Sequence, residues 1–260
     1  MARTAIRRRL TWRLATVVAN ALETRTVHRL SLQIDGWDAH LPGQHVDVRL
    51  TAPDGYQAQR SYSIASAPES PTVDLVVQRL EDGEVSPYLT DGLRAGDQFE
   101  LRGPIGGHFV WHADLDSPLQ LVAGGSGVAP FLAMLDHHSA VGAGAPVRLL
   151  YSARSLDEVI GRARLEQHAQ RGVGVTITLT REQPPGWAGL SNRLTPEIIR
   201  EHVWPVDQRP SMFVCGPTTF VEAVADSLVE AGHPPVAVKT ERFGDARGAR
   251  RDTGVPTTRR

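Results

Sequence analysis

Cysteine and long apolar runs are nearly absent from this chain, and each shortage excludes a class of protein. The 260 residues include one cysteine, Cys215, so the chain cannot form an internal disulfide or hold an iron–sulfur cluster on its own cysteines. No apolar run approaches the length of a membrane span, and we expect no membrane partner. The arginine-rich start lacks the apolar core of a signal peptide, because Asn20 and Glu23 interrupt it. We therefore predict a cytoplasmic protein.

Net charge is also close to zero. A formal net charge of −1 at pH 7 offers no general attraction to nucleic acid, so we predict no nucleic-acid partner. The basic residues gather at the ends of the chain, and we predict that residues 245–260 form a basic, disordered tail. The ten histidines show no spacing typical of a zinc site, and no metal is predicted.

Residues 10–114 are predicted to form an antiparallel β-barrel. Short segments with alternating apolar side chains recur along them, and turn signals such as Asp35-Gly36 and Asp82-Gly83 separate the segments. We expect strands at residues 14–18, 27–34, 45–50, 61–64, 73–77 and 98–101, and one short helix at 85–93.

Residues 117–244 change to an alternation of strands and helices. This order predicts a doubly wound α/β domain, in which a parallel sheet has helices on both faces. We expect strands at residues 119–123, 147–151, 173–179, 211–215 and 236–240, and helices at 130–139, 156–170, from 195, and 218–231.

The segment Arg60-Ser61-Tyr62-Ser63 combines a cation, a phenol and serine hydroxyls in one short stretch. A flavin site needs these groups: an aromatic ring beside the isoalloxazine, hydroxyls for its polar edge, and a guanidinium for its phosphate. The competing interpretation is an edge strand with a solvated arginine.

A second motif, Gly124-Gly125-Ser126-Gly127, follows a buried-type strand and precedes a helix. Glycines at this junction let the backbone approach a pyrophosphate, and the helix offers free N–H groups. Arg154 and Arg181 both follow strands, where a guanidinium suits the 2′-phosphate of NADPH. The alternative for both arginines is that they only solvate loop ends.

Taken in order with Cys215-Gly216-Pro217, these motifs resemble the ferredoxin–NADP reductase superfamily over residues 13–244. The resemblance implies that Gly83-Glu84-Val85-Ser86 holds the flavin pyrophosphate. It places Cys215 beside the nicotinamide ring, where it positions the ring and does not attack it. It gives Glu241 a place at the flavin edge and Phe243 a place over the isoalloxazine. The chain departs from the plant-type pattern, because its aromatic residue is Phe and sixteen residues follow Gly244. The alternative is that Phe243 is only a structural anchor.

The predicted catalytic residues are Ser63, Cys215 and Glu241. The predicted cofactor-binding residues are Arg60, Ser61, Tyr62, Ser63, Val77, Arg79, Gly83, Val85, Ser86, Gly125, Ser126, Gly127, Arg154, Arg181, Cys215, Gly216, Pro217 and Phe243.

The resemblance implies an NAD(P)H-dependent FAD oxidoreductase that passes electrons from NADPH to a separate carrier. We expect a [2Fe–2S] ferredoxin that serves an oxygenase or a cytochrome P450. One alternative is a flavin or ferric reductase acting on a diffusible acceptor, and another is a non-catalytic flavin- or nucleotide-binding subunit. The residues leave open FMN in place of FAD, and NADH in place of NADPH.

Overall fold

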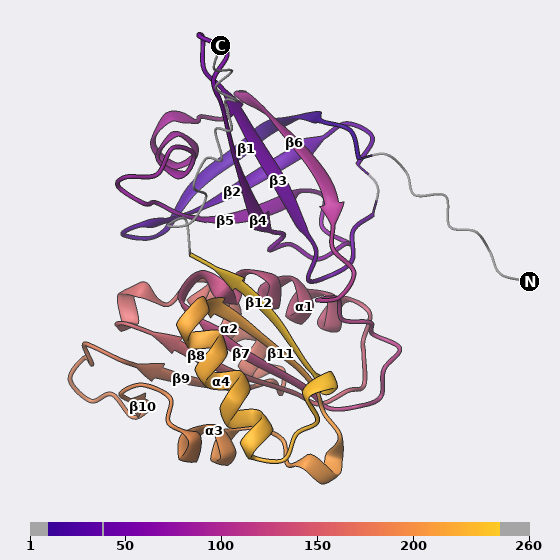
Figure 1. Ribbon diagram of the computed structural model, residues 1–260, viewed down its shortest axis with the longest axis vertical. Coiled ribbons are helices and arrows are strands. Elements are labelled where there is room, and N and C mark those ends of the chain that lie inside the picture. The colour runs from indigo at the N-terminus through magenta and orange to yellow at the C-terminus, as the bar shows by residue number, and fades with distance from the viewer. Residues whose placement is uncertain (1–9, 38, 245–260) are drawn as a thin grey trace, which may run out of the picture.

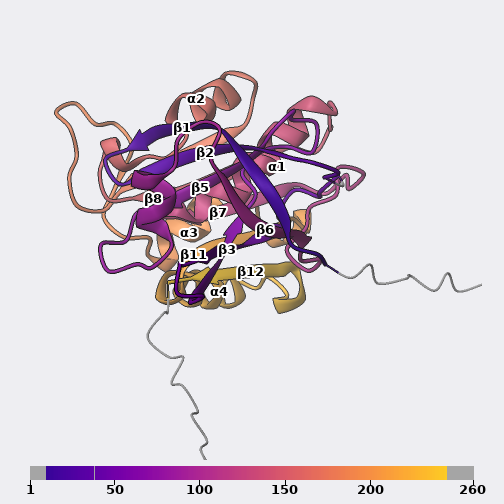
Figure 2. The same cartoon turned by 90° about the horizontal axis from the view of Figure 1, so that it is seen from above.

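The structure, a computed structural model, describes residues 10–37 and 39–244. Two sheets lie one above the other, and helices α1 and α2 lie between them (Figure 1). Seen from above, the ends of β1 and β2 lie over α2 (Figure 2). The tail that the sequence predicts at 245–260 lies outside the described residues.

The first sheet is antiparallel, with six strands in the order β4-β3-β6-β1-β2-β5. Its strands are β1 (Arg13–Thr24), β2 (Val27–Ile34), β3 (His45–Thr51), β4 (Gln57–Ser63), β5 (Val73–Gln78) and β6 (Gln98–Ile105). Their inward side chains form one core, which includes Leu30, Val48 and Leu75. A short π-helix, η1 (Tyr88–Gly92), adds Leu89 to this core.

The second sheet is parallel, with six strands in the order β10-β9-β8-β7-β11-β12. Its strands are β7 (Leu119–Gly124), β8 (Val147–Ala153), β9 (Gly174–Leu179), β10 (Leu190–Ser191), β11 (Ser211–Pro217) and β12 (Val238–Phe243). Four α-helices connect them: α1 (Ala129–Ala140), α2 (Arg162–Gln170), α3 (Pro196–His202) and α4 (Thr218–Glu230). The 3₁₀ turns are η2 (Gly125–Val128), η3 (Leu156–Glu158), η4 (Val206–Gln208) and η5 (Pro235–Ala237).

Helices cover both faces of the parallel sheet. Phe131 of α1 and Leu165 of α2 pack in one core, whereas Ile199 of α3 and Val221 of α4 pack in another. The predicted fold class, an antiparallel barrel-like domain followed by a doubly wound α/β domain, is confirmed.

Strand β4 is longer than the sequence pattern indicated. It begins at Gln57 instead of Ser61 and pairs with β3 from Thr51 to His45. The added residues Gln59 and Arg60 are polar and exposed, so no apolar alternation marked them as a strand.

The single helix predicted at 156–170 is wrong. The chain forms the short η3, leaves helical geometry and then begins α2. Gly161 adopts a left-handed φ of +66°, and a Cβ there would lie 3.0 Å from Leu132. Glycine is therefore suited to this sharp entry into α2.

Strand β12 starts and ends later than predicted. Pro235 and Val236 form η5, and the strand pairs with β11 from Val238 to Phe243. Glu241 and Phe243 consequently lie within the sheet and have a defined register.

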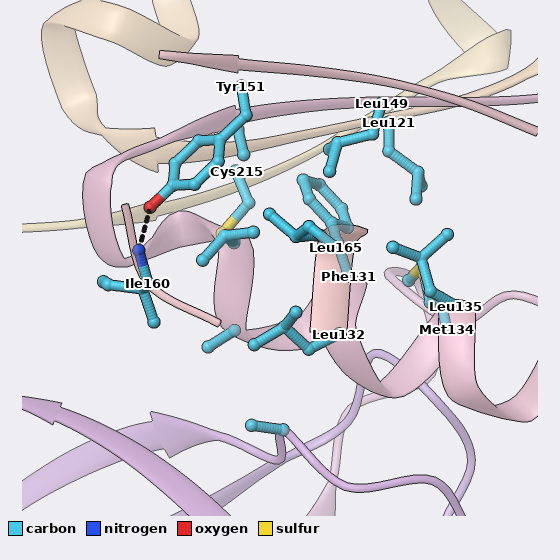
Figure 3. Packing of buried hydrophobic residues seen from close by; sticks show 14 of the residues in the cluster. Leu121, Phe131, Leu132, Met134, Leu135, Leu149, Tyr151, Ile160, Leu165 and Cys215 are labelled. Atoms are coloured by element: carbon cyan, nitrogen blue, oxygen red, sulfur yellow. Dashed lines mark hydrogen bonds between the residues drawn. The ribbon is translucent and has the colours of Figure 1, made fainter. Parts of the chain in front are cut away.

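One apolar core connects the two sheets. Val27, Ala65 and Val76, from the first sheet and its adjoining chain, belong to the same buried cluster as Leu132 of α1. Figure 3 shows part of this cluster, in which Leu132 of α1, Leu165 of α2 and Cys215 of β11 are labelled. We propose residues 10–114 and 117–244 as the two domains, joined by this shared core.

Candidate functional site

The ends of β4 and β12 meet between the two domains. Ser63 closes β4, and its hydroxyl donates to Oε2 of Glu241 over 3.5 Å. Cys215 stands in register with Glu241, because β11 and β12 run parallel. The structure thus brings together the three residues predicted to be catalytic, although 178 positions separate Ser63 from Glu241.

The Glu241 carboxyl is poised to exchange a proton near neutral pH. Burial raises the pKa of Glu241 to about 7, and the hydrogen bond from Ser63 acts in the opposite direction. His45, at the start of β3, places Nδ1 at 3.7 Å from Oε1 of Glu241. Burial lowers the pKa of His45, although nearby Asp47 opposes the shift. His45 was not among the residues predicted from the sequence, since no local pattern connects it with β12.

Cys215 is a buried thiol and not a nucleophile. It is 1% exposed. Burial raises the pKa of its thiol well above the ordinary value, and the neighbouring Glu241 raises it further. The thiolate is therefore disfavoured, which agrees with a residue that shapes the site through packing.

Arg60 and Tyr62 lie on the same side of β4. The Tyr62 ring packs partly against the barrel core, and burial raises the pKa of its phenol to about 12. Arg60 is half exposed, and its Nη2 lies 3.1 Å from Oε2 of Glu84. Tyr56 donates its hydroxyl to the other oxygen of Glu84 over 2.6 Å. A half-exposed guanidinium thus lies next to the Gly83 turn and is paired there with Glu84.

The turn from Leu80 to Ser86, where the sequence predicts the flavin pyrophosphate, is tightly closed. Ser86 Oγ accepts the Leu80 N–H over 3.1 Å, which closes the turn and leaves the serine O–H free to donate. A Cβ on Gly83 would lie 2.9 Å from Ser86 Oγ and 3.1 Å from the Leu80 carbonyl. The close turn thus needs glycine, and Val85 beneath it is buried in the barrel core.

Three of the predicted flavin residues point elsewhere. Ser61 donates to Oδ1 of Asp47 over 2.6 Å, and by strand alternation it faces away from Arg60 and Tyr62. Val77 is fully buried in the barrel core, so only its backbone can reach a ligand. Arg79 Nε lies 2.8 Å from Asp91.

The glycine loop is closely fitted to the end of β11. A Cβ on Gly127 would lie 2.2 Å from the Cys215 carbonyl oxygen, so no other residue fits there. A Cβ on Gly216 would lie 2.7 Å from the Phe220 ring. Gly125 instead has a left-handed φ of +55° and open space around it. Ser126 and Gly125 face this open space, as a pyrophosphate-binding loop requires.

A cleft of about 180 Å³ opens beside this loop, between the two domains. Its lining from the α/β domain includes Ser126, Arg154, Pro217 and Phe243, all predicted to bind cofactor. Arg181 lies beside it, because its N–H donates to the Arg154 carbonyl over 2.9 Å.

Other residues of this cleft were not predicted. Thr24, Thr26 and Gln78 line it from the barrel, and Ser126 donates to Gln78 across it over 3.1 Å. Glu158, which the sequence pattern places in a helix, lies in η3 and also lines the cleft. These residues line the cleft only because the two domains pack against each other, and the local sequence pattern does not show that packing.

The described part of the chain offers no metal site, since no three or more His, Cys, Asp or Glu side chains gather there. Across the same residues, no helix combines the length and apolarity needed to cross a bilayer.

Comparison with known proteins identifies both domains. Residues 14–111 match the oxidoreductase FAD-binding domain family, and residues 121–226 match the oxidoreductase NAD-binding domain family. The fold and the site therefore define an oxidoreductase that binds FAD and a pyridine nucleotide.

Related proteins identify the family of oxidoreductases to which the chain belongs. Ferredoxin–NADP reductase B of Sorangium cellulosum is 36% identical over 209 residues, which cover 77% of this chain and 84% of that protein. The chain belongs to the ferredoxin–NADP reductase superfamily. It is also 29% identical to the toluate 1,2-dioxygenase electron transfer component of Pseudomonas putida, over 79% of this chain and 59% of the relative.

Among solved structures, the Amycolatopsis cytochrome P450 reductase GcoB is similar, with a TM-score of 0.79 and 27% identity. That match covers 90% of this chain and 70% of the other. The chain spans about three fifths of the length of several curated relatives.

Proposed function

We propose that this protein is an NAD(P)H-dependent flavoprotein reductase that passes electrons from NADPH through FAD to a separate ferredoxin-type carrier. The contact between Ser63 and Glu241 carries the proposal, because it joins the predicted flavin strand to the predicted nicotinamide site. The likeness to an electron transfer component of a dioxygenase and to a P450 reductase supports the same direction of electron flow. The proposal includes a cytoplasmic location.

The chain's residues bind and orient the two cofactors. Bound flavin supplies the redox chemistry, since it takes a hydride from the nicotinamide and can release electrons singly. Arg60 and the Gly83 turn would hold its phosphates, and Tyr62 would lie beside its ring. Phe243, at the cleft, would cover the opposite side of the ring.

Ser63 and Glu241 would act at the reacting end. The Ser63 hydroxyl can donate to the polar edge of the flavin ring, and the Glu241 carboxyl can hold or release a proton because its pKa lies near 7. Cys215, buried beside Glu241 in the sheet, would limit by its packing the space in which the nicotinamide ring can lie.

The α/β domain would bind the nucleotide by its phosphates. Amides of the Gly125–Gly127 loop and the start of α1 suit the pyrophosphate. Arg154 and Arg181, joined through their backbones at the cleft, suit the 2′-phosphate and support NADPH as the preferred donor.

Anaerobic stopped-flow reduction of the FAD-loaded protein tests this function. Wild-type flavin should be bleached by NADPH, and Ser63→Ala should slow this step at least about tenfold, near 1.4 kcal/mol of barrier. Ser61→Ala is a matched control, because Ser61 lies in the same strand as Ser63 but its hydroxyl donates to Asp47 of β3. A protein that binds no flavin, or flavin that neither nucleotide reduces, would contradict the proposal.

The acceptor is then tested with the reduced protein. Small [2Fe–2S] ferredoxins should accept electrons faster than free FAD, FMN or ferric chelates. Faster turnover of free flavin than of every ferredoxin would instead establish the flavin-reductase alternative.

A further inference from the structure

The start of helix α2 is attached to the barrel at two points. Arg164 donates from Nη2 to the Ala65 carbonyl over 3.0 Å. Gly161, just before α2, donates its N–H to Oε2 of Glu23 over 3.3 Å. Glu23 belongs to β1, and Ala65 lies two residues beyond Ser63, the last residue of β4. A helix of the nucleotide-binding domain thus holds the segment that directly follows the predicted flavin strand β4.

Side chains of α1 and α2 hold the Arg164 guanidinium in place. The guanidinium forms an ion pair with Asp136 of α1. His168 of α2 places Nε2 at 2.8 Å from the other oxygen of Asp136, and Ser139 Oγ lies 3.3 Å from His168 Nδ1. Burial opposes ionisation of Asp136, but the contacts with His168 and Arg164 hold its pKa below the ordinary value. Asp136 therefore remains charged and fixes the direction of Arg164.

The two attachment points are also linked through the barrel. Ala65 donates its N–H to the Asp74 carbonyl over 2.8 Å. Arg29 lies 3.5 Å from the Asp74 carboxylate and 2.9 Å from that of Glu23. Because Glu23 returns to Gly161, the contacts form a closed polar ring that runs through both domains.

The two domains also share apolar contacts. Val27, Ala65 and Val76 from the barrel side belong to the same buried cluster as Leu132 and Ile160. Interfaces between domains are usually polar and allow relative motion, whereas a shared core holds a fixed orientation. The ring and the core together leave little freedom between β4 and the nucleotide-binding sheet.

We propose that this ring fixes the hydride-transfer geometry, and that Arg164 is a positioning residue for the reaction. The inference rests on the proposed function, since it concerns the distance between its two cofactors. Arg164 touches neither predicted cofactor site and acts through Ala65 on the strand that ends in Ser63. A displacement of about 1 Å in a reacting pair can cost on the order of a hundredfold in rate, so loss of this contact should affect the chemical step.

Arg164→Met tests the inference in the full chain loaded with FAD. The limiting rate of flavin reduction at saturating NADPH should fall at least about tenfold. FAD content and the dissociation constant for NADP⁺ should change less than about twofold, because neither site loses a contact. The long-wavelength charge-transfer absorbance of the nicotinamide–flavin complex should weaken. Arg164→Lys should recover much of both signals, since it restores a cation beside Asp136.

Arg162→Met is the matched control. Arg162 lies on the same helix and pairs with Glu166 within it, so its replacement should leave the reduction rate and the absorbance unchanged. If Arg164→Met does not fold, Glu23→Gln is measured in its place, because it weakens the ring at Gly161.

Hydrogen exchange of the cofactor-free protein gives a readout that does not depend on turnover. Peptides covering residues 62–67 and 158–165 should exchange faster in Arg164→Met than in Arg162→Met. Equal reduction rates and equal exchange in the two variants would overturn the inference. The inference would also be overturned if Arg164→Met reduced its flavin slowly only because it binds the nucleotide more weakly. A wild-type protein whose flavin is not reduced would contradict the proposed function, and the exchange measurement would still test the ring.

Discussion

Arg60 is paired with a carboxylate at the place where a flavin phosphate is expected. Glu84 lies within the turn from Leu80 to Ser86 and contacts both Arg60 and Tyr56. A bound diphosphate would bring further negative charge to the same guanidinium. Glu84 and the cofactor therefore compete for Arg60, and the two residues should affect flavin affinity in opposite directions.

Arg60→Ala should weaken FAD binding by roughly tenfold to a hundredfold, because a charge-assisted contact is worth about 1.5–3 kcal/mol. Glu84→Gln should tighten it by a few fold, since exposed ion pairs contribute about 0–1 kcal/mol. Fluorescence titration of cofactor-free protein with FAD measures both. Arg49→Ala, on the neighbouring strand and paired with Glu100, is the control. Equal affinities for Arg60→Ala and the control would remove Arg60 from the flavin site.

Glu241 makes stability depend on pH in an unusual direction. Its pKa is about 7 in the folded protein, against an ordinary value of 4.5. The folded state therefore binds the proton more tightly, and the free energy of unfolding falls as pH rises from about 4.5 to about 7. The loss is on the order of 3 kcal/mol.

Glu241→Gln should remove this fall, so the variant should gain stability over wild type at pH 8 but not at pH 4.5. Urea unfolding of the cofactor-free protein at both pH values measures the difference. Glu100→Gln should show the opposite sign, but only below about pH 4.5, because the hydrogen bond from Arg49 lowers the pKa of Glu100 from its ordinary 4.5. Extending the urea series to about pH 3 tests this control. A pH-independent difference between wild type and Glu241→Gln would contradict the pKa argument.

At the scale of elements, the π-helix η1 depends on one side chain from β1. Asn20 Nδ2 lies 3.2, 3.1 and 3.0 Å from the carbonyl oxygens of Leu89, Thr90 and Leu93. His28 Nδ1 lies 2.8 Å from the side-chain oxygen Oδ1 of Asn20 and orients the side-chain amide. The helix end is thus satisfied from the barrel wall.

Asn20→Ala should lower the free energy of unfolding by about 1–3 kcal/mol, because it leaves these carbonyls unpaired. FAD affinity should fall as well, since η1 begins two residues after Ser86. Urea unfolding and FAD titration measure the two effects. Gln33→Ala, exposed on the adjacent β2, should change neither. An unchanged free energy of unfolding in Asn20→Ala would contradict the prediction, because it would show that water can hydrogen bond these carbonyl oxygens in place of the Asn20 amide.

The two strand ends that carry Arg154 and Arg181 form one feature, because the backbones are hydrogen bonded at the cleft. Replacing both residues with Gln should reduce the preference for NADPH over NADH by at least about tenfold, as a charge-assisted contact is lost. Turnover with NADH should change little, and kcat/KM for the two nucleotides is the measurement. Arg193→Gln, an exposed loop arginine, is the control. A wild-type enzyme that prefers NADH would contradict the assignment.

The sequence predicted the fold because strand and helix periods were distinct in the two halves. Ser63 and Cys215 were proposed as site residues from their motifs. The predicted strand at 61–64 was too short, since the outer residues Gln59 and Arg60 of β4 are polar. The break before α2 was missed because only Gly161 marks it and its neighbours suit a helix. Long-range contacts left no local signal, and His45 beside Glu241 is an example.

For the whole molecule, the proposed partner is a separate electron carrier. An acidic carrier would be attracted to exposed arginine side chains of this protein before the two make contact. Salt screens this attraction over about 10 Å at 0.1 M. NADPH oxidation should be slow with oxygen alone and rise strongly when a small [2Fe–2S] ferredoxin is added. The stimulation should fall as salt increases, whereas the rate of flavin reduction by NADPH should not. A stimulation that is independent of salt would contradict electrostatic guidance.

The position of β12 has a consequence during synthesis. Every other element of the site lies earlier in the chain, and Glu241 and Phe243 are translated after the barrel and after β11. A nascent chain that has left the ribosome as far as residue 230 would carry the flavin cradle without the acid that faces Ser63. If the proposed function holds, hydride transfer would have to wait for β12, and translation that stops before it would yield a flavin-binding chain without reductase activity.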